Sequence, residues 1–196
     1  MVKMKPTLKI GLIFAAVWIA LKLLFWQLGI FQESIHITGL INTLFLLLAI
    51  ALGLYFQKKK EGLSNGTALT DVKNALQSGV LYTVIVSVFL YFYYDSINPE
   101  FTENRINEMS DMFYDNMQRE SYVDSLKLQN PDIEELKNED IIRKNKSELE
   151  QNLSPYSTFI FSLLGLIILA FTYSILVTLV FRMILFKDYI QKEPNP

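Results

Sequence analysis

Residues 156–181 read YSTFIFSLLGLIILAFTYSILVTLVF, twenty-six consecutive positions without a charged side chain. A helix needs about 20 mainly apolar residues to cross roughly 30 Å of hydrocarbon. Three further runs precede this one, at about 8–26, 37–56 and 72–94, and they contain few charges. Continuous runs of this length are typical of membrane helices, because the strands of membrane barrels are shorter and alternate in polarity. The sequence therefore predicts an all-α, polytopic membrane protein with four transmembrane helices, three of them within residues 1–94 and the fourth at 156–186.

The polar stretch 95–155 separates the third predicted span from the fourth and concentrates the acidic residues. It holds 15 Asp and Glu side chains against 7 Lys and Arg, a local charge of −8. The remaining chain has 5 acidic and 11 basic side chains, a charge of +6, so the total of −2 hides a strong segregation.

Basic residues cluster at three sites: the N-terminus, the connection between the second and third spans, and the C-terminal end. The topology-determining set is Lys3, Lys5, Lys9, Lys58, Lys59, Lys60, Arg182 and Lys187. In a chain with four spans these sites share one side of the membrane, and short cytoplasmic loops are enriched in Lys and Arg. We therefore expect an up-down-up-down arrangement with both termini, including a tail at 187–196, in the cytoplasm. The acidic stretch 95–155 then lies outside.

Within 95–155, the pairs Asn98-Pro99 and Asn130-Pro131 predict two helix starts, because proline suits the first helical turn. Apolar residues recur at three-to-four spacing after each pair, which favours one helix at about 99–127 and another at 131–152. The two apolar stripes are Ile106, Met109, Phe113 and Met117, and Ile133, Leu136, Ile142, Leu149 and Leu153. The expected result is an extramembrane helical hairpin with these stripes facing each other. Disorder is the alternative, since the stretch is acidic and only modestly apolar.

Small and hydroxylated residues recur every four positions in the third and fourth spans. They are Ala75, Gly79, Thr83 and Ser87, and Ala170, Ser174 and Thr178. Such stripes let helix backbones approach closely in lipid. We expect them to pack the four-helix bundle internally, and a homo-oligomer face is the alternative.

The sequence offers few residues for chemistry. It has no Cys and a single histidine, His36, so neither a disulfide framework nor a metal-ligand set is evident. P-loop, GxSxG, HExxH and GxGxxG motifs are absent, as is a basic patch with interleaved aromatics for nucleic acid. No acidic residue lies at the centre of a span, which argues against proton-coupled transport. Lys22, the one charge well inside an apolar run, either snorkels to the headgroups or has an intramembrane role.

Several short motifs are ordered along the chain in a pattern that is typical of one family. They are Gly66-Thr67-Ala68-Leu69 ahead of Gly79, a Tyr-rich end to the third span, Ile97-Asn98-Pro99-Glu100-Phe101, and Leu153-Ser154-Pro155 before a last Gly-containing span. In this layout the chain resembles, over nearly its whole length, the bacterial membrane family catalogued as domain of unknown function 4199. The resemblance implies a small four-span protein, mainly of Bacteroidetes, in the inner membrane with a periplasmic polar segment. It implies no catalytic or binding residues, because the family has no known active site.

These observations predict a non-enzymatic integral membrane protein, without catalytic residues, cofactor or metal, that acts by interaction through residues 95–155. The expected partners are the lipid bilayer and either another protein or a second copy of this chain, and not nucleic acid. One alternative is a small transporter or channel-like protein, whose polar path would come from Asn42, Thr43, Ser78, Thr83, Ser87, Ser162 and Thr172. Another is an intramembrane enzyme, for which no constellation of residues exists.

Overall fold

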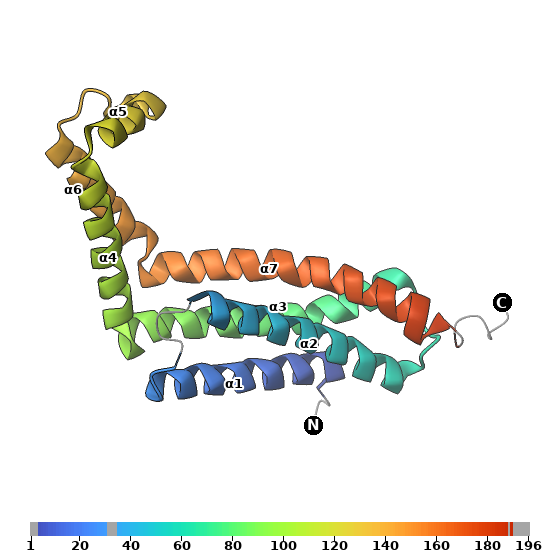
Figure 1. Ribbon diagram of the computed structural model, residues 1–196. Helices are drawn as coiled ribbons and strands as arrows, with labels where there is room; N and C mark the ends of the chain where they lie inside the picture. Colours follow the sequence, from blue (N-terminus) through green and yellow to red (C-terminus); the bar gives the residue numbers. More distant parts are fainter. Residues whose placement is uncertain (1–3, 31–34, 188, 190–196) are drawn as a thin grey trace. The chain divides into compact units, whose positions relative to one another are not determined.

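The computed structural model describes residues 4–30, 35–187 and 189, and every regular element within these ranges is helical (Figure 1). The described residues form two compact units. We call the first, within residues 1–89 and 161–196, the bundle unit, and the second, residues 90–160, the acidic unit. The ranges of helices α3 and α7 cross these limits, so each contributes residues to both units.

Four helices are long and apolar enough to cross a membrane, which confirms the prediction of four such helices. They are α1 (Pro6–Gln27), α2 (Ile35–Glu61), α3 (Ala68–Phe92) and α7 (Pro155–Val180). The π-helical segments η1 (Tyr93–Ile97) and η3 (Phe181–Leu185) continue α3 and α7. The main difference from the expected bounds is at α2, which includes Lys58–Lys60 and ends at Glu61.

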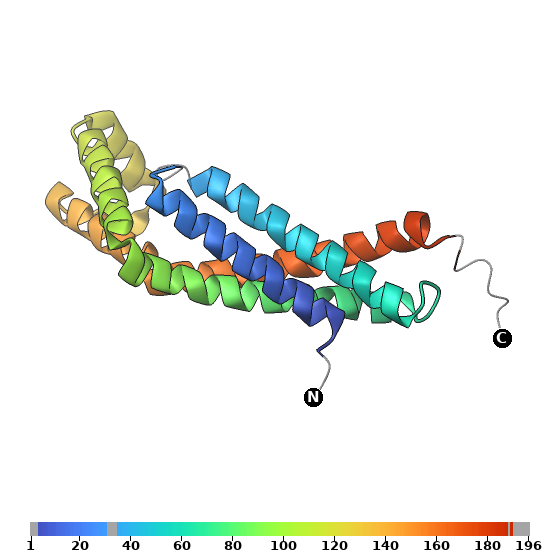
Figure 2. The ribbon, with the colours of Figure 1, turned by 90° about the horizontal axis from the view of Figure 1, so that it is seen from below.

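In the bundle unit the four helices run alongside one another, and the direction of the chain alternates from each helix to the next (Figures 1 and 2). The start of α1, the end of α2, the start of α3 and segment η3 therefore share one end of the bundle unit. We call it the basic end. Helix α1 buries a single stripe, made of Thr7, Gly11, Ala15 and Trp18, and leaves most of its other side chains partly or fully exposed.

Three helices meet at Ser78 of α3. A Cβ atom added at Gly11 of α1 would lie 2.6 Å from the Ser78 carbonyl oxygen, and one added at Gly53 of α2 would lie 2.7 Å from Ser78 Oγ. Ser78 Oγ donates a hydrogen bond of 2.7 Å to the Ala49 carbonyl oxygen of α2. The backbones can approach this closely because glycine has no side chain.

The acidic unit contains α4 (Pro99–Met117), α5 (Glu120–Gln129), the 3₁₀ turn η2 (Pro131–Ile133) and α6 (Asn138–Asn152). Helices α4 and α6 pack against each other. The small core consists of Met117, Val123, Ile133 and Ile141, with Phe113, Tyr122, Leu126, Leu136 and Ile142 around it. Five of these nine residues belong to the apolar stripes expected from the sequence.

The expected helix bounds in the acidic unit are wrong at two places. The helix expected at 99–127 breaks after Met117, and Arg119 has an extended backbone with φ −98° and ψ 114°. The break gives α5 a new direction, so Val123 reaches the same core as Met117. The helix expected at 131–152 begins only at Asn138, since Lys137 is extended with φ −71° and ψ 151°.

Candidate functional site

A buried charge cluster lies at the basic end of the bundle unit, where one carboxylate is held between two cations. Lys58 Nζ lies 3.2 Å from Asp71 Oδ1. Arg182 donates a hydrogen bond of 2.7 Å from its NH1 group to Asp71 Oδ2. The three side chains come from α2, α3 and the π-helical end of α7.

The loop between α2 and α3 brings Lys58 and Asp71 together. Gly62 and Gly66 turn the chain with φ values of +104° and +87°, a region that favours glycine. The turn places Asp71 in the first turn of α3, where a negative charge also complements the helix dipole. Both cations hold the loop as well: Lys58 donates to the Asn65 carbonyl, and Arg182 NH1 donates to the Gly66 carbonyl at 3.2 Å.

The cluster is shielded from solvent. The side chains of Lys58 and Asp71 are 1% and 2% exposed, and that of Arg182 is 23% exposed. The Phe186 ring, itself buried, lies with its centre 5.9 Å from Lys58 Nζ, within the range of a cation–π interaction. Two cations against one carboxylate leave one net positive charge.

This arrangement fastens helices together. All three charged groups point at one another or at backbone carbonyls, so the cluster ties α2, the loop and α3 to the end of α7. Among the described residues, no group of three or more His, Cys, Asp or Glu side chains is placed to hold a metal ion. His36 is exposed in the first turn of α2.

A family model described as "Protein of unknown function (DUF4199)" matches residues 9–192. The chain belongs to this family. The match covers Lys58, Asp71 and Arg182 and confirms the resemblance noted in the sequence. The family description names no activity. No curated protein and no solved structure matches the chain.

The basic residues expected to set the topology of this DUF4199 protein occupy two kinds of position. Lys58 and Arg182 belong to the buried cluster. The exposed ones are Lys5, Lys9, Lys59, Lys60 and Lys187, while Lys3 lies outside the described residues. Sequence reasoning missed Asp71 as their common partner, although it is the only acidic residue between positions 62 and 94.

The small-residue stripes of the DUF4199 chain lie in its interior. All seven members are buried: Ala75, Gly79, Thr83, Ser87, Ala170, Ser174 and Thr178. A Cβ atom added at Gly79 would lie 3.0 Å from Ala170 Cβ and 2.9 Å from Ile50 Cδ1. Helices α3 and α7 therefore approach each other closely where Gly79 faces Ala170, with Ile50 of α2 at the same point.

The hydroxyl groups of these stripes differ in whether they form hydrogen bonds. Ser174 Oγ donates to the Ala170 carbonyl of its own helix at 2.6 Å. The buried hydroxyls of Thr83, Ser87 and Thr178 have no hydrogen-bond partner among the described residues.

The seven polar residues of the transporter alternative are dispersed. Tyr82 is fully buried and donates to Asn42 Oδ1 at 2.6 Å, which links α3 to α2. The hydroxyls of Thr43 and Thr172 bond carbonyls of their own helices, and Thr172 is exposed. Ser162 is half-buried, whereas Ser78, Thr83 and Ser87 are buried.

Lys22, the charge inside α1, is half-buried and lines a small recess with Trp18, Phe25 and Thr38.

Proposed function

We propose that this DUF4199 protein is a non-enzymatic, multi-pass protein of the bacterial inner membrane that presents its acidic unit to a protein partner. Both termini and the basic end of the bundle unit lie in the cytoplasm, and the acidic unit lies in the periplasm. The observation that carries the proposal is that residues 90–160 form a compact unit with a core of its own. A mere connection between two spans would not need such a core.

The charge of the acidic unit favours a basic partner. The segment 95–155 carries a net charge of −8, so a basic protein surface is attracted to it and a second acidic unit is repelled. Apolar side chains project from the same unit: Leu128 is 88% exposed, Met112 60% and Tyr114 52%. Apolar anchors within a charged surround are typical of the surfaces by which proteins bind one another.

The orientation is supported by the distribution of cations. The exposed Lys5, Lys9, Lys59 and Lys60 belong to the end of α1 and the end of α2 that share the basic end. Cations beside span ends are retained on the cytoplasmic side during insertion. Within the bundle unit α3 and α7 run in opposite directions, so the chain leaves α3 and enters α7 at the end of the bundle unit away from these cations, which supports a periplasmic location for the segment that joins them.

Crosslinking in cells tests the proposal. A photoreactive residue in place of Leu128 should capture a partner, and association should weaken as salt is raised, because exposed charges are screened. The variant Asp124→Asn/Glu134→Gln/Glu135→Gln should lose this partner, since all three acids are exposed. The matched control, Arg119→Gln/Lys144→Gln/Lys146→Gln, removes three exposed bases and should retain it.

Two outcomes would contradict the proposal. One is an association that survives deletion of residues 103–152, which would make the acidic unit a spacer. The other is a crosslinked product consisting of two copies of this chain and nothing else, which would replace the partner with a homo-oligomer.

A further inference from the structure

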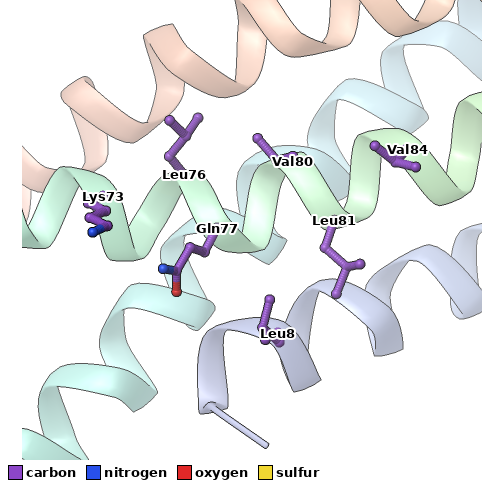
Figure 3. Close-up of a pocket in the computed structure, with 7 residues that line it drawn as sticks. All are labelled: Leu8, Lys73, Leu76, Gln77, Val80, Leu81 and Val84. Carbon is purple, nitrogen blue, oxygen red and sulfur yellow. The ribbon is translucent and has the colours of Figure 1, made fainter.

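A groove of about 440 Å³ runs along the surface of the bundle unit between α1 and α3. Its walls are Leu8 of α1 and α3 residues between Lys73 and Val84. Figure 3 shows Leu8 and Leu81 pointing toward each other from the two helices, with Lys73 and Gln77 toward one end of the groove. The volume is in the range of sites that bind small molecules.

The lining of the groove is almost wholly apolar, and its two polar residues, Lys73 and Gln77, lie toward one end. Toward the basic end, Gln77 Oε1 accepts a hydrogen bond of 3.4 Å from Thr7 Oγ1. Lys73 is exposed, and within the described ranges it forms no ion pair. Beyond Gln77 the α3 lining consists of Val80, Leu81 and Val84. The groove thus places the Lys73 ammonium group, for which the described part of the chain offers no ion-pair partner, beside an apolar trough.

The length of the trough matches one membrane leaflet. Lys73 and Val84 are eleven residues apart on one helix, a distance of about 16 Å at the rise of an α-helix. Half of a hydrocarbon core roughly 30 Å thick is about 15 Å. A molecule with a charged head at Lys73 and an aliphatic tail along Val80 and Val84 would therefore reach about the middle of the bilayer.

We propose that this groove binds an anionic phospholipid from the leaflet at the basic end. The lipid phosphate pairs with the Lys73 ammonium group, and one acyl chain lies along Val80, Leu81 and Val84. Access is lateral, from the bilayer, because Val80 is 37% exposed and Val84 43% exposed. The proposal is independent of what the acidic unit binds.

Charge argues against a second copy of this chain as the occupant. Lys73 lies at an exposed position near the start of α3, where a basic side chain attracts anionic lipid headgroups. Across α1, α2, α3 and α7 the acidic residues are Asp71, which is buried between two cations, and Glu61 at the end of α2, which accepts a hydrogen bond from Gln57. Of these helices, a second copy would therefore bring to Lys73 only the Glu61 carboxylate, which already has a partner within α2, whereas an anionic phospholipid brings both a phosphate and an acyl chain that fits the trough.

Native mass spectrometry tests the proposal. The full-length protein, in detergent micelles, is titrated with phosphatidylglycerol or with phosphatidylcholine. We expect a single bound phosphatidylglycerol and weaker binding of phosphatidylcholine. Lys73→Gln should weaken phosphatidylglycerol binding about fivefold, the equivalent of the about 1 kcal/mol that a basic residue contributes near an anionic surface. Lys59→Gln, which removes an exposed cation outside the groove, should leave binding unchanged. Lys73→Arg should retain the preference for phosphatidylglycerol over phosphatidylcholine. This variant tests the role of the charge if Lys73→Gln does not fold.

Substitutions that fill the trough provide a second, independent test of the proposal. Val80→Phe/Val84→Phe should reduce binding of both lipids, while Val88→Phe, at a 41% exposed position one turn beyond the groove, should not. Equal losses in Lys73→Gln and Lys59→Gln would overturn the proposal in favour of nonspecific attraction. Unchanged lipid binding in the filled variant would also overturn it, as would a dimer that this variant abolishes without any change in bound lipid.

Discussion

Replacing Asp71 with asparagine removes the one negative charge from the buried cluster while keeping the shape of the side chain. The amide presents an NH₂ group where one carboxylate oxygen was, and that group would face Lys58 Nζ, now at 3.2 Å, or Arg182 NH1, now at 2.7 Å. Either placement sets donor against donor and leaves two cations without a counter-charge. Removing one partner of a buried ion pair costs about 3–5 kcal/mol. Because Asp71 is only 2% exposed, water does little to compensate, and we expect a loss in this range for Asp71→Asn.

Unfolding of the full-length protein in mixed detergent micelles measures this loss. The chain has two tryptophans, Trp18 and Trp26, both in α1, so tryptophan fluorescence reports on the bundle unit. Lys60→Gln, which removes an exposed charge from the last turn of α2, should change the free energy of unfolding by less than about 0.5 kcal/mol.

A variant without any charge in the cluster separates ion pairing from packing. Replacing all members of a buried ion cluster with apolar residues is often neutral. Lys58→Met/Asp71→Leu/Arg182→Met should therefore be more stable than Asp71→Asn alone. Asp71→Asn as stable as Lys60→Gln, or a triple variant no more stable than Asp71→Asn, would show that ion pairing does not hold the cluster together.

Two further substitutions test the packing of each unit. Gly11→Ala should destabilise the bundle unit by about 1–3 kcal/mol, because its Cβ would lie 2.6 Å from the Ser78 carbonyl oxygen, whereas Gly165→Ala meets nothing within 4 Å and should not. Equal stability of these two variants, measured by tryptophan fluorescence, would contradict the close approach of α1 and α3. Ile141→Ala should destabilise the acidic unit by about 2–5 kcal/mol, since Ile141 is 3% exposed, while Met112→Ala, at a 60% exposed position, should have little effect. Hydrogen exchange should show faster exchange across 99–152 in the Ile141 variant alone, and unchanged protection there would show that this core is not what stabilises the unit.

The four apolar helices could be predicted because a membrane span depends on one local property, about 20 successive residues with few charges. The charge cluster could not be predicted in the same way. Asp71 and Arg182 are 111 residues apart in the chain, and nothing near either residue indicates that they meet. The run Lys58–Lys60 reads as a solvated loop, yet α2 continues through it with Lys58 turned inward and its two neighbours exposed.

The acidic unit shows the limit of periodicity as a guide to helix bounds. The Asn-Pro pairs mark real element starts at Pro99 and Pro131, because proline restricts the backbone wherever it occurs. The break at Gln118 and Arg119 has no such signal, since neither glycine nor proline is present there. It is favoured by a tertiary effect, the burial of Val123 against Met117, which the three-to-four spacing of either helix alone does not reveal.

The claim that the acidic unit and the basic end lie on opposite sides of the membrane is tested most directly by cysteine labelling. The natural chain has no cysteine, so single variants at exposed positions give an unambiguous signal. Ser121→Cys in α5 and Ala68→Cys at the start of α3 are both at exposed positions. With a membrane-impermeant maleimide on intact spheroplasts, Ser121→Cys should react, and Ala68→Cys should react only after permeabilisation. Labelling of Ala68→Cys on intact spheroplasts, with Ser121→Cys protected until permeabilisation, would contradict the account.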